Sequence, residues 1–265
     1  MSRPGRPSAI SIDSMDWVAI AAIGAAVGFL AGMFGKGGSA IATPLLHAVG
    51  VPAIVSVAAP LPATIPSTLV AFSAYWRRDL VDRQVLRWSV GIGVPATVVG
   101  ALATLWIGGG PLVTATDVVV AVLGLRILLG PDAADDAIGD AERDSLGFRI
   151  RLGLVSAVVG LAAGLLANSG GFLLAPLYIA VLRMPLKPAF ACSLAVAAAL
   201  AVPGTIVHAA LGHIDWAVVA VFGLTSVPFS YWGARVAVRS DARWLGRAYG
   251  VALVVLGVGF LVFGR

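Results

Sequence analysis

The amino-acid sequence predicts an all-α polytopic membrane protein of two inverted repeats, each with about five helical segments and one short broken helix, or about 8 to 10 segments in total. Three observations predict this fold class. Charged residues make up only 12% of the chain and hydrophobic residues 59%, at a mean hydropathy of +0.97, whereas soluble domains carry about 25% charged residues. Several uncharged stretches reach the roughly 20 residues that a helix needs to cross a bilayer. Nine residues of the first half also recur, in order, in the second half.

The recurring residues are glycines, prolines and one aspartate. Gly28, Gly32, Gly38 and Pro44 recur 132 residues later as Gly160, Gly164, Gly170 and Pro176. Pro52, Asp82, Pro95, Gly100 and Gly124 recur 133 residues later as Pro185, Asp215, Pro228, Gly233 and Gly257. One inserted residue in the second half explains the change of spacing. Internal repeats of this kind are typical of transporters that build a central site at a symmetry axis.

The apolar segments follow a polar tail at 1–16 and fall into repeat 1 at 17–130 and repeat 2 at 152–265, joined by a hydrophilic linker at 131–151. In repeat 1 we expect helical segments at roughly 17–35, 39–50, 53–76, 88–107 and 111–130. In repeat 2 we expect them at roughly 152–167, 171–182, 188–209, 216–238 and 247–264. The first apolar run lacks a clear signal-peptide cleavage site, so we expect it to be retained as a helix.

Loop charges predict that the two repeats have opposite orientations in the membrane. Four arginines follow the third segment of repeat 1, whereas the equivalent loop of repeat 2, residues 211–215, has no Lys or Arg. The next loop reverses the pattern, with none at 107–111 and four arginines around its counterpart. The two groups are Arg77, Arg78, Arg83 and Arg87, and Arg235, Arg239, Arg243 and Arg247. Because cytoplasmic loops carry an excess of Lys and Arg, we expect both termini outside the cytoplasm. Eight crossings with two re-entrant segments remain the alternative.

The second segment of each half is too short to cross the membrane. Residues 39–50 and 171–182 are 12 residues each, about 18 Å as helices, against a bilayer core of about 30 Å. Each follows a glycine-rich break, Gly35-Lys36-Gly37-Gly38-Ser39 or Asn168-Ser169-Gly170-Gly171. Short, glycine-interrupted segments at matching positions of two halves predict a transport site.

The two breaks have the chemistry of a site for a small anion. A break leaves backbone N–H groups unpaired at the start of the following half-helix, where the helix dipole is positive. We expect eight residues in this site: Lys36, Gly37, Gly38, Ser39, Asn168, Ser169, Gly170 and Gly171. The alternative is that such glycines only allow close helix packing. Packing is the role we expect for five other glycines: Gly24, Gly28, Gly32, Gly160 and Gly164.

Three titratable side chains are candidates for proton coupling: Lys36, His47 and His208. Lys36 is the only Lys or Arg between Arg6 and Arg77, and an ammonium group within a membrane segment is costly and usually functional. Alternatively, Lys36 extends to water at the cytoplasmic face. For the two histidines a hydrogen-bonded structural role is the alternative. For Asp82 and Asp215, which match between the repeats, we expect capping or turn formation.

The sequence argues against an enzyme and against nucleic-acid binding. It contains no nucleotide-binding loop, zinc-ligand spacing, catalytic triad or carboxylate pair, so we expect no catalytic residue, no metal and no cofactor. The net charge of +5 comes from arginines in loops, which the positive-inside bias explains better than nucleic acid does. The single cysteine, Cys192, excludes an intrachain disulfide. The expected partners are a small anion and the lipid bilayer. A homodimer is also compatible with the sequence.

Two segments resemble the duplicated signature of the sulfite exporter TauE/SafE family: GFLAGMFGKGGSAIATPLL at Gly28–Leu46 and GLAAGLLANSGGFLLAPLY at Gly160–Tyr178. The elements VPAIVSVAAPLPATIP and HAALGHID and the turn Arg77–Asp82 also look like that family, so the resemblance covers about 17–262. It implies a secondary transporter, and specifically an exporter, of small sulfur-containing anions such as sulfite, thiosulfate or sulfonates. It also implies alternating access, coupling to the proton gradient and a place in the bacterial plasma membrane.

The sequence departs from the family pattern inside the expected site. The family usually has a small or apolar residue where Lys36 stands and glycines where Ser39 and Ser169 stand. The identity of the substrate therefore does not follow from the resemblance. A passive anion channel and a transporter of a non-sulfur organic anion are the alternatives.

Overall fold

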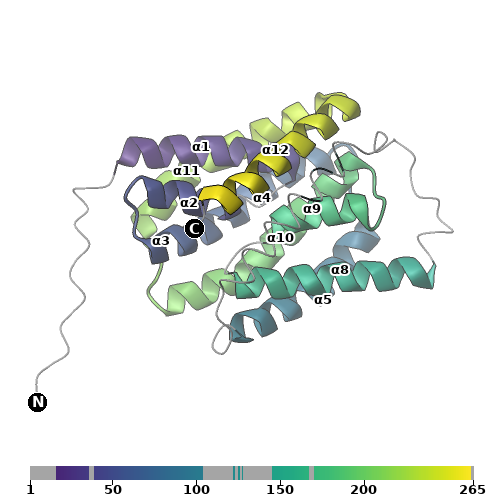
Figure 1. Cartoon of the computed structure of the whole chain (residues 1–265), viewed down its shortest axis with the longest axis horizontal. Helices are drawn as coiled ribbons and strands as arrows, with labels where there is room; N and C mark the ends of the chain where they lie inside the picture. Colours follow the sequence, from purple (N-terminus) through teal and green to yellow (C-terminus); the bar gives the residue numbers. More distant parts are fainter. Residues whose placement is uncertain are drawn as a thin grey trace, which may run out of the picture.

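In the computed structural model, the described part of the chain comprises residues 16–35, 39–103, 145–166 and 170–263, with the single helical positions 122, 125 and 127. These residues form helices joined by turns, with no strand among them. The helices, shown in Figure 1, are α1 (Trp17–Phe34), α2 (Ser39–Ala48), α3 (Ala53–Ala58), α4 (Pro60–Trp76), α5 (Arg83–Ala103), α8 (Leu146–Leu165), α9 (Gly171–Ala180), α10 (Leu186–Ala210), α11 (Trp216–Arg239) and α12 (Ala242–Phe263). The predicted all-α class is confirmed.

Six helical stretches among the described residues are long and apolar enough to cross a membrane. They are α1, the combined stretch Ala53–Trp76 of α3 and α4, α5, α8, α10 and α11. The second segments are short as expected, since α2 and α9 have 10 residues each, about 15 Å of helix. The segment expected at 111–130 lies outside the described residues apart from positions 122, 125 and 127.

Several helix boundaries differ from those expected. The third segment is divided into α3 and α4, because Pro60 lacks the N–H that would continue the helical hydrogen bonds. The helices α5, α8 and α12 begin five or six residues earlier than expected. At each of these starts a side chain, from Asp82, Ser145 or Asp241, accepts hydrogen bonds from backbone N–H groups of the first turn. These caps stabilise polar first turns that hydropathy alone leaves out.

The capping role expected for the matched aspartates is confirmed. Asp82 Oδ1 accepts two first-turn N–H groups of α5 at 3.0 and 3.1 Å. Asp215 Oδ1 accepts two first-turn N–H groups of α11 at 2.9 and 3.2 Å. The two aspartates therefore begin equivalent helices in the same way.

The helices α1 and α11 pack in direct backbone contact. A Cβ atom added at Gly28 would overlap the Ser226 carbonyl, and one added at Gly32 would overlap the Ser230 carbonyl. A Cβ added at Gly24 would lie 2.7 Å from the Phe222 carbonyl oxygen. Because the contacting residue numbers rise together, the two helices run parallel. The packing role expected for these glycines is confirmed.

The helices α5 and α8 form the equivalent pair, since α8 is the counterpart of α1 and α5 that of α11. A Cβ added at Gly160 would overlap the Gly93 carbonyl, and one added at Gly164 would overlap the Thr97 carbonyl. These helices also run parallel. Small residues thus bring both pairs together, as is common where lipid supplies no hydrophobic driving force.

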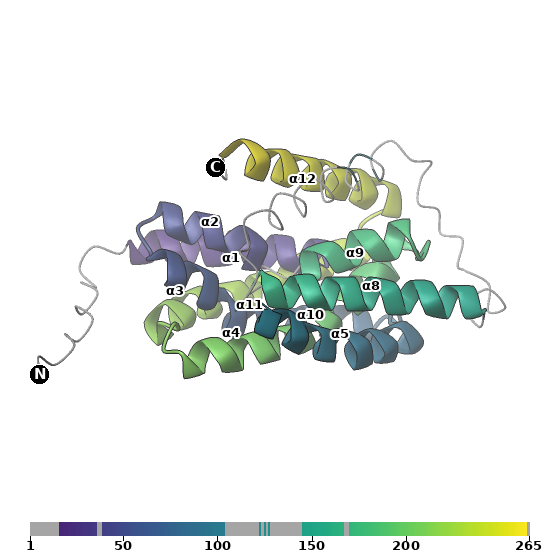
Figure 2. The same ribbon diagram turned by 60° about the horizontal axis from the view of Figure 1, so that its bottom comes forward.

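Four arginines lie together at one end of the described helices. Arg77 and Arg78, which follow α4, lie beside Arg235 and Arg239 at the end of α11. The loop 77–82 therefore lies at the C-terminal end of α11, whereas its counterpart in repeat 2, loop 211–215, directly precedes α11. The 24 residues of α11 span about 36 Å. Figures 1 and 2 also show α1 and α8 crossing the molecule in opposite directions.

Candidate substrate site

The first break lies between α1 and α2. Gly35 follows the last residue of α1 with a φ of 63°, a left-handed conformation that glycine adopts without strain. Its N–H donates to the Ala31 carbonyl, and α2 begins at Ser39. A Cβ at position 35 would lie 2.5 Å from Phe190 Cα on α10. Glycine is therefore needed at this position both for its conformation and for the close approach of α10.

Side chains from α4 and α10 bind the carbonyls that precede this break. The Tyr75 hydroxyl on α4 donates to the Gly32 carbonyl at 3.2 Å, and the Ser193 hydroxyl on α10 donates to the Gly35 carbonyl. Carbonyls in the last turn of a helix have no partner within the helix. Two buried hydroxyls therefore hold the end of α1 in place.

The second break lies between α8, which ends at Leu165, and α9, which begins at Gly171. Gly170 has a φ of 67°, and its carbonyl accepts hydrogen bonds from first-turn N–H groups of α9. A Cβ at Gly170 would lie 3.1 Å from the Leu200 side chain on α10. This break is therefore also flanked by a left-handed glycine in contact with α10.

The helix α10 contacts the flanks of both breaks. Gly35 meets it at Phe190 and Ser193, and Gly170 meets it at Leu200. Seven helical residues from Ser193 to Leu200 rise about 10 Å. Both breaks thus lie along one stretch of a single buried helix.

Three of the eight residues expected in the site are described. Ser39 begins α2, Gly170 precedes α9 and Gly171 begins it. The other five, Lys36, Gly37, Gly38, Asn168 and Ser169, lie outside the described residues.

A buried polar network that the sequence analysis missed joins α5, α8 and α9. The Tyr178 hydroxyl donates to Ser89 Oγ at 2.7 Å, and Ser156 Oγ lies 3.1 Å from the same oxygen. The three residues are at most 1% exposed. The sequence contains one signal for this network. At the repeat spacing, its three members correspond to residues without a polar side chain in the other half.

The two histidines expected as candidates for proton coupling have local partners. His47 on α2 is exposed, with Nδ1 3.2 Å from the Val51 carbonyl. His208, near the end of α10, has Nδ1 3.2 Å from Nδ1 of His213. One imidazole of this pair must carry the proton on Nδ1 and the other must accept it. His213, which the sequence analysis missed, is brought to His208 by a turn at Gly212 with a φ of 70°.

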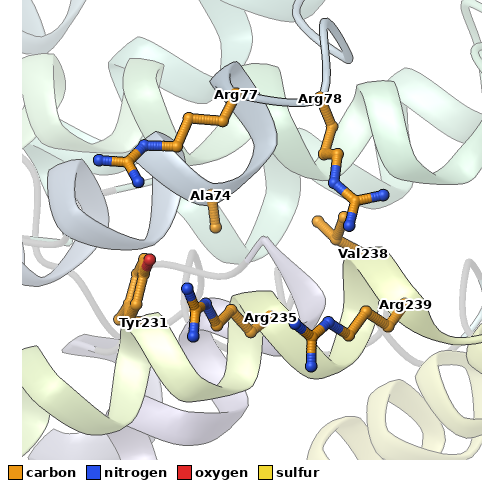
Figure 3. A pocket seen from close by; sticks show the side chains of 7 residues that line it. All are labelled: Ala74, Arg77, Arg78, Tyr231, Arg235, Val238 and Arg239. Carbon is orange, nitrogen blue, oxygen red and sulfur yellow. The ribbon is translucent and has the colours of Figure 1, made fainter.

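A cavity lined by four arginines lies at the charged end of the molecule, between α4 and α11 (Figure 3). Its volume is about 110 Å³, and its lining residues are Ala74, Arg77, Arg78, Tyr231, Arg235, Val238 and Arg239. The Arg235 guanidinium lies 4.8 Å from the centre of the Tyr231 ring, a cation–π contact. In the sequence, these arginines predict only the orientation of the chain in the membrane.

The family model for the sulfite exporter TauE/SafE matches residues 20–260. The chain belongs to the sulfite exporter TauE/SafE family. Two similar proteins from Xylella fastidiosa, strains 9a5c and Temecula1 / ATCC 700964, are each named "Probable membrane transporter protein". Each is 28% identical over 249 residues, which cover 91% of this chain and 93% of the relative. No solved structure matches the chain.

This member of the TauE/SafE family is a multi-pass integral membrane protein. Its two signature segments are the two helix breaks with their flanks. Gly28–Leu46 runs from α1 into α2, and Gly160–Tyr178 runs from α8 into α9. Each TauE/SafE signature therefore ends one long helix and begins one short one.

Proposed function

We propose that this membrane transporter is a secondary transporter that exports small sulfur-containing anions, such as sulfite, thiosulfate or a sulfonate, by alternating access with proton coupling. One observation carries the proposal: two glycine breaks at equivalent positions, each flanked by a left-handed glycine in contact with α10. Membership of the TauE/SafE family supports it, as do the names of the Xylella fastidiosa relatives.

In this proposal the anion binds between the N-termini of α2 and α9. Each short helix begins directly after its break, so its first N–H groups have no partner within the helix and its dipole is positive there. Lys36 supplies a counter-charge, while Ser39, Asn168 and Ser169 supply polar donors. The glycines let the anion approach the backbone closely.

We propose that the two repeats are inverted and rock around this site. The positions of the loops support inversion, because loop 77–82 and its counterpart 211–215 lie at opposite ends of α11. The opposite directions of α1 and α8 support it too (Figures 1 and 2). The parallel pairs α1/α11 and α5/α8 each join one repeat to the other, so a movement at one pair has an equivalent at the other.

We assign proton coupling to Lys36, His47 or His208, the three candidates that the sequence predicts for this role. His208 is the better placed of the two histidines, because His213 can exchange a proton with it at 3.2 Å. Exchange of His208 for Gln would then make transport independent of an imposed pH gradient, without preventing binding of the anion.

The test is transport of radiolabelled sulfite, thiosulfate and taurine in proteoliposomes, with and without a pH gradient. We expect accumulation of at least one sulfur anion that depends on the gradient. Transport of a cation with no sulfur anion transported would contradict the proposal. Flux at channel rates, independent of the gradient, would establish the passive channel instead.

Lys36 gives the sharpest variant in this assay. Lys36→Ala should lower anion transport at least about tenfold, because an intramembrane counter-charge is lost. Lys36→Arg, which keeps the charge, is the matched control and should retain most of the rate. Wild-type transport by Lys36→Ala would remove Lys36 from the site.

A further inference from the structure

The arginine-lined cavity continues into an apolar groove on the outer face of α11. The groove has a volume of about 320 Å³ and is lined by Phe29, Trp232, Arg235, Val236 and Arg239. Arg235 and Arg239 line both the cavity and the groove. One continuous surface thus has a cationic part and an apolar part.

The cationic part is strongly unbalanced in charge. None of the seven residues that line the cavity is acidic, and no carboxylate is paired with its four arginines in the described part of the chain. Figure 3 shows Arg77 and Arg78 reaching toward the cavity from one helix end and Arg235 and Arg239 from the other. Guanidinium groups bind phosphate through two parallel hydrogen bonds, which makes a phosphate group a suitable ligand.

The apolar part of the surface is exposed. Trp232 is 63% exposed and Val236 39% exposed, on a helix long enough to cross the membrane. A small inorganic anion has no apolar part to bury in such a groove, whereas a lipid has an acyl chain. Arginine clusters mark the cytoplasmic side of a membrane, where the leaflet is rich in anionic lipids.

We propose that this surface is a binding site for an anionic phospholipid. The phosphate lies among Arg77, Arg78, Arg235 and Arg239, and one acyl chain lies along Phe29, Trp232 and Val236. The site is separate from the two helix breaks and does not depend on the transported substrate. It joins α11 to α1, the helix that precedes the first break, since Phe29 lies on α1.

The test is native mass spectrometry of the full-length chain, titrated with phosphatidylglycerol or with phosphatidylcholine of the same acyl chains. We expect preferential binding of phosphatidylglycerol. Replacement of Arg235 and Arg239 together by Gln should weaken its binding about 30-fold, since each arginine near an anionic lipid contributes about fivefold. The matched control replaces Arg87 and Arg247, two exposed arginines that line neither cavity nor groove, and should change the affinity less than about threefold.

A second variant distinguishes a lipid from a free anion. Trp232→Ala should weaken phosphatidylglycerol binding several-fold and leave the binding of glycerol 3-phosphate unchanged. The proposal is wrong if phosphatidylcholine binds as well as phosphatidylglycerol, or if the control pair loses as much affinity as the cavity pair. It is also wrong if glycerol 3-phosphate binds as tightly as the lipid, because the surface would then be a site for free anions.

Discussion

The helix pairs α1/α11 and α5/α8 are equivalent in the repeat but differ in what they bury. In both pairs, glycines of one helix (α1 or α8) meet backbone carbonyls of the other (α11 or α5). The α5/α8 pair also holds the hydroxyl network of Ser89, Ser156 and Tyr178. The matching positions are occupied by Phe222 on α11 for Ser89, Gly24 on α1 for Ser156 and Leu46 on α2 for Tyr178. Phe222 and Leu46 belong to an apolar cluster.

This difference shows which features of the duplication are constrained in both copies. The glycine contacts set the distance between helix axes, so a larger side chain there would force the helices apart. The interior side chains next to them are polar in one pair and apolar in the other, although both pairs keep that contact. Another matched pair differs in its partner: Tyr75 binds the end of α1, whereas its counterpart His208 pairs with His213.

The largest expected effect tests whether the two pairs bear the same packing constraint. Gly32→Ala and Gly164→Ala should each lower the free energy of unfolding by about 1–3 kcal/mol, because the added Cβ overlaps a carbonyl. Thermal unfolding in detergent measures the loss. Gly91→Ala on α5, where no atom lies within 4 Å of an added Cβ, is the control and should be neutral or stabilising. If either variant melts like the control, that pair does not need its backbone contact.

Removal of the matched caps compares the starts of α5 and α11. Asp82→Ala and Asp215→Ala should each lower the free energy of unfolding by about 1 kcal/mol, because two first-turn N–H groups lose their acceptor. The two losses should be similar, because each aspartate accepts the same pair of first-turn hydrogen bonds. The corresponding Asn variants keep a capping oxygen and should be close to wild type. A greater loss at Asp215 would show that the two starts are not equivalent.

Removal of a single hydroxyl group tests the polar network. Tyr178→Phe should lower the free energy of unfolding by about 0.6 kcal/mol, the average for a hydrogen bond within a membrane protein. Tyr249→Phe is the matched control, because the Tyr249 hydroxyl is equally buried and has no hydrogen-bond partner in the described part of the chain. Removal of the Tyr249 hydroxyl should leave the free energy of unfolding unchanged or raise it. Equal melting temperatures for the two variants would mean that the network adds no stability to the α5/α8 side.

The smallest expected effect concerns Asp241, the exposed residue that caps the start of α12, the helix that follows α11. Hydrogen bonds from the backbone N–H groups of Trp244 and Arg243 lower the pKa of the Asp241 carboxyl. Because the folded pKa lies below the unfolded value of about 3.9, the ionised cap adds stability above that pH and loses it as the pH falls through the lowered pKa. Asp241→Asn should therefore melt slightly below wild type near neutral pH and approach it in acid. A difference that grows on acidification would contradict this sign.

Several parts of the fold and site follow from short stretches of sequence. The glycines at 35–38 and 170–171 predict the breaks, because no other residue combines positive φ with close backbone approach. The capping role of Asp82 and Asp215 also follows from the sequence, because a cap acts on N–H groups two or three residues away. The sequence places α5, α8 and α12 several residues late, because hydropathy does not register a polar first turn that a cap stabilises.

The remaining features depend on residues far apart in the chain. Tyr178 and Ser89 are 89 residues apart, and Ser193 reaches the Gly35 carbonyl across 158 residues. The arginine cavity joins the ends of α4 and α11, from different repeats. Loop charge predicts which side of the membrane these arginines occupy, but not that they line one cavity.

By itself, the sequence determined that the chain is helical and membrane-embedded, that it is duplicated, and that each copy contains a helix break. These properties follow from hydropathy, glycine conformation and capping, all of which act within a few residues. Only the tertiary structure decided that α1 pairs with α11, that α5 pairs with α8, and that α10 contacts both breaks. Such pairings depend on which helix surfaces can approach to backbone contact, and that depends on the shapes of two surfaces together.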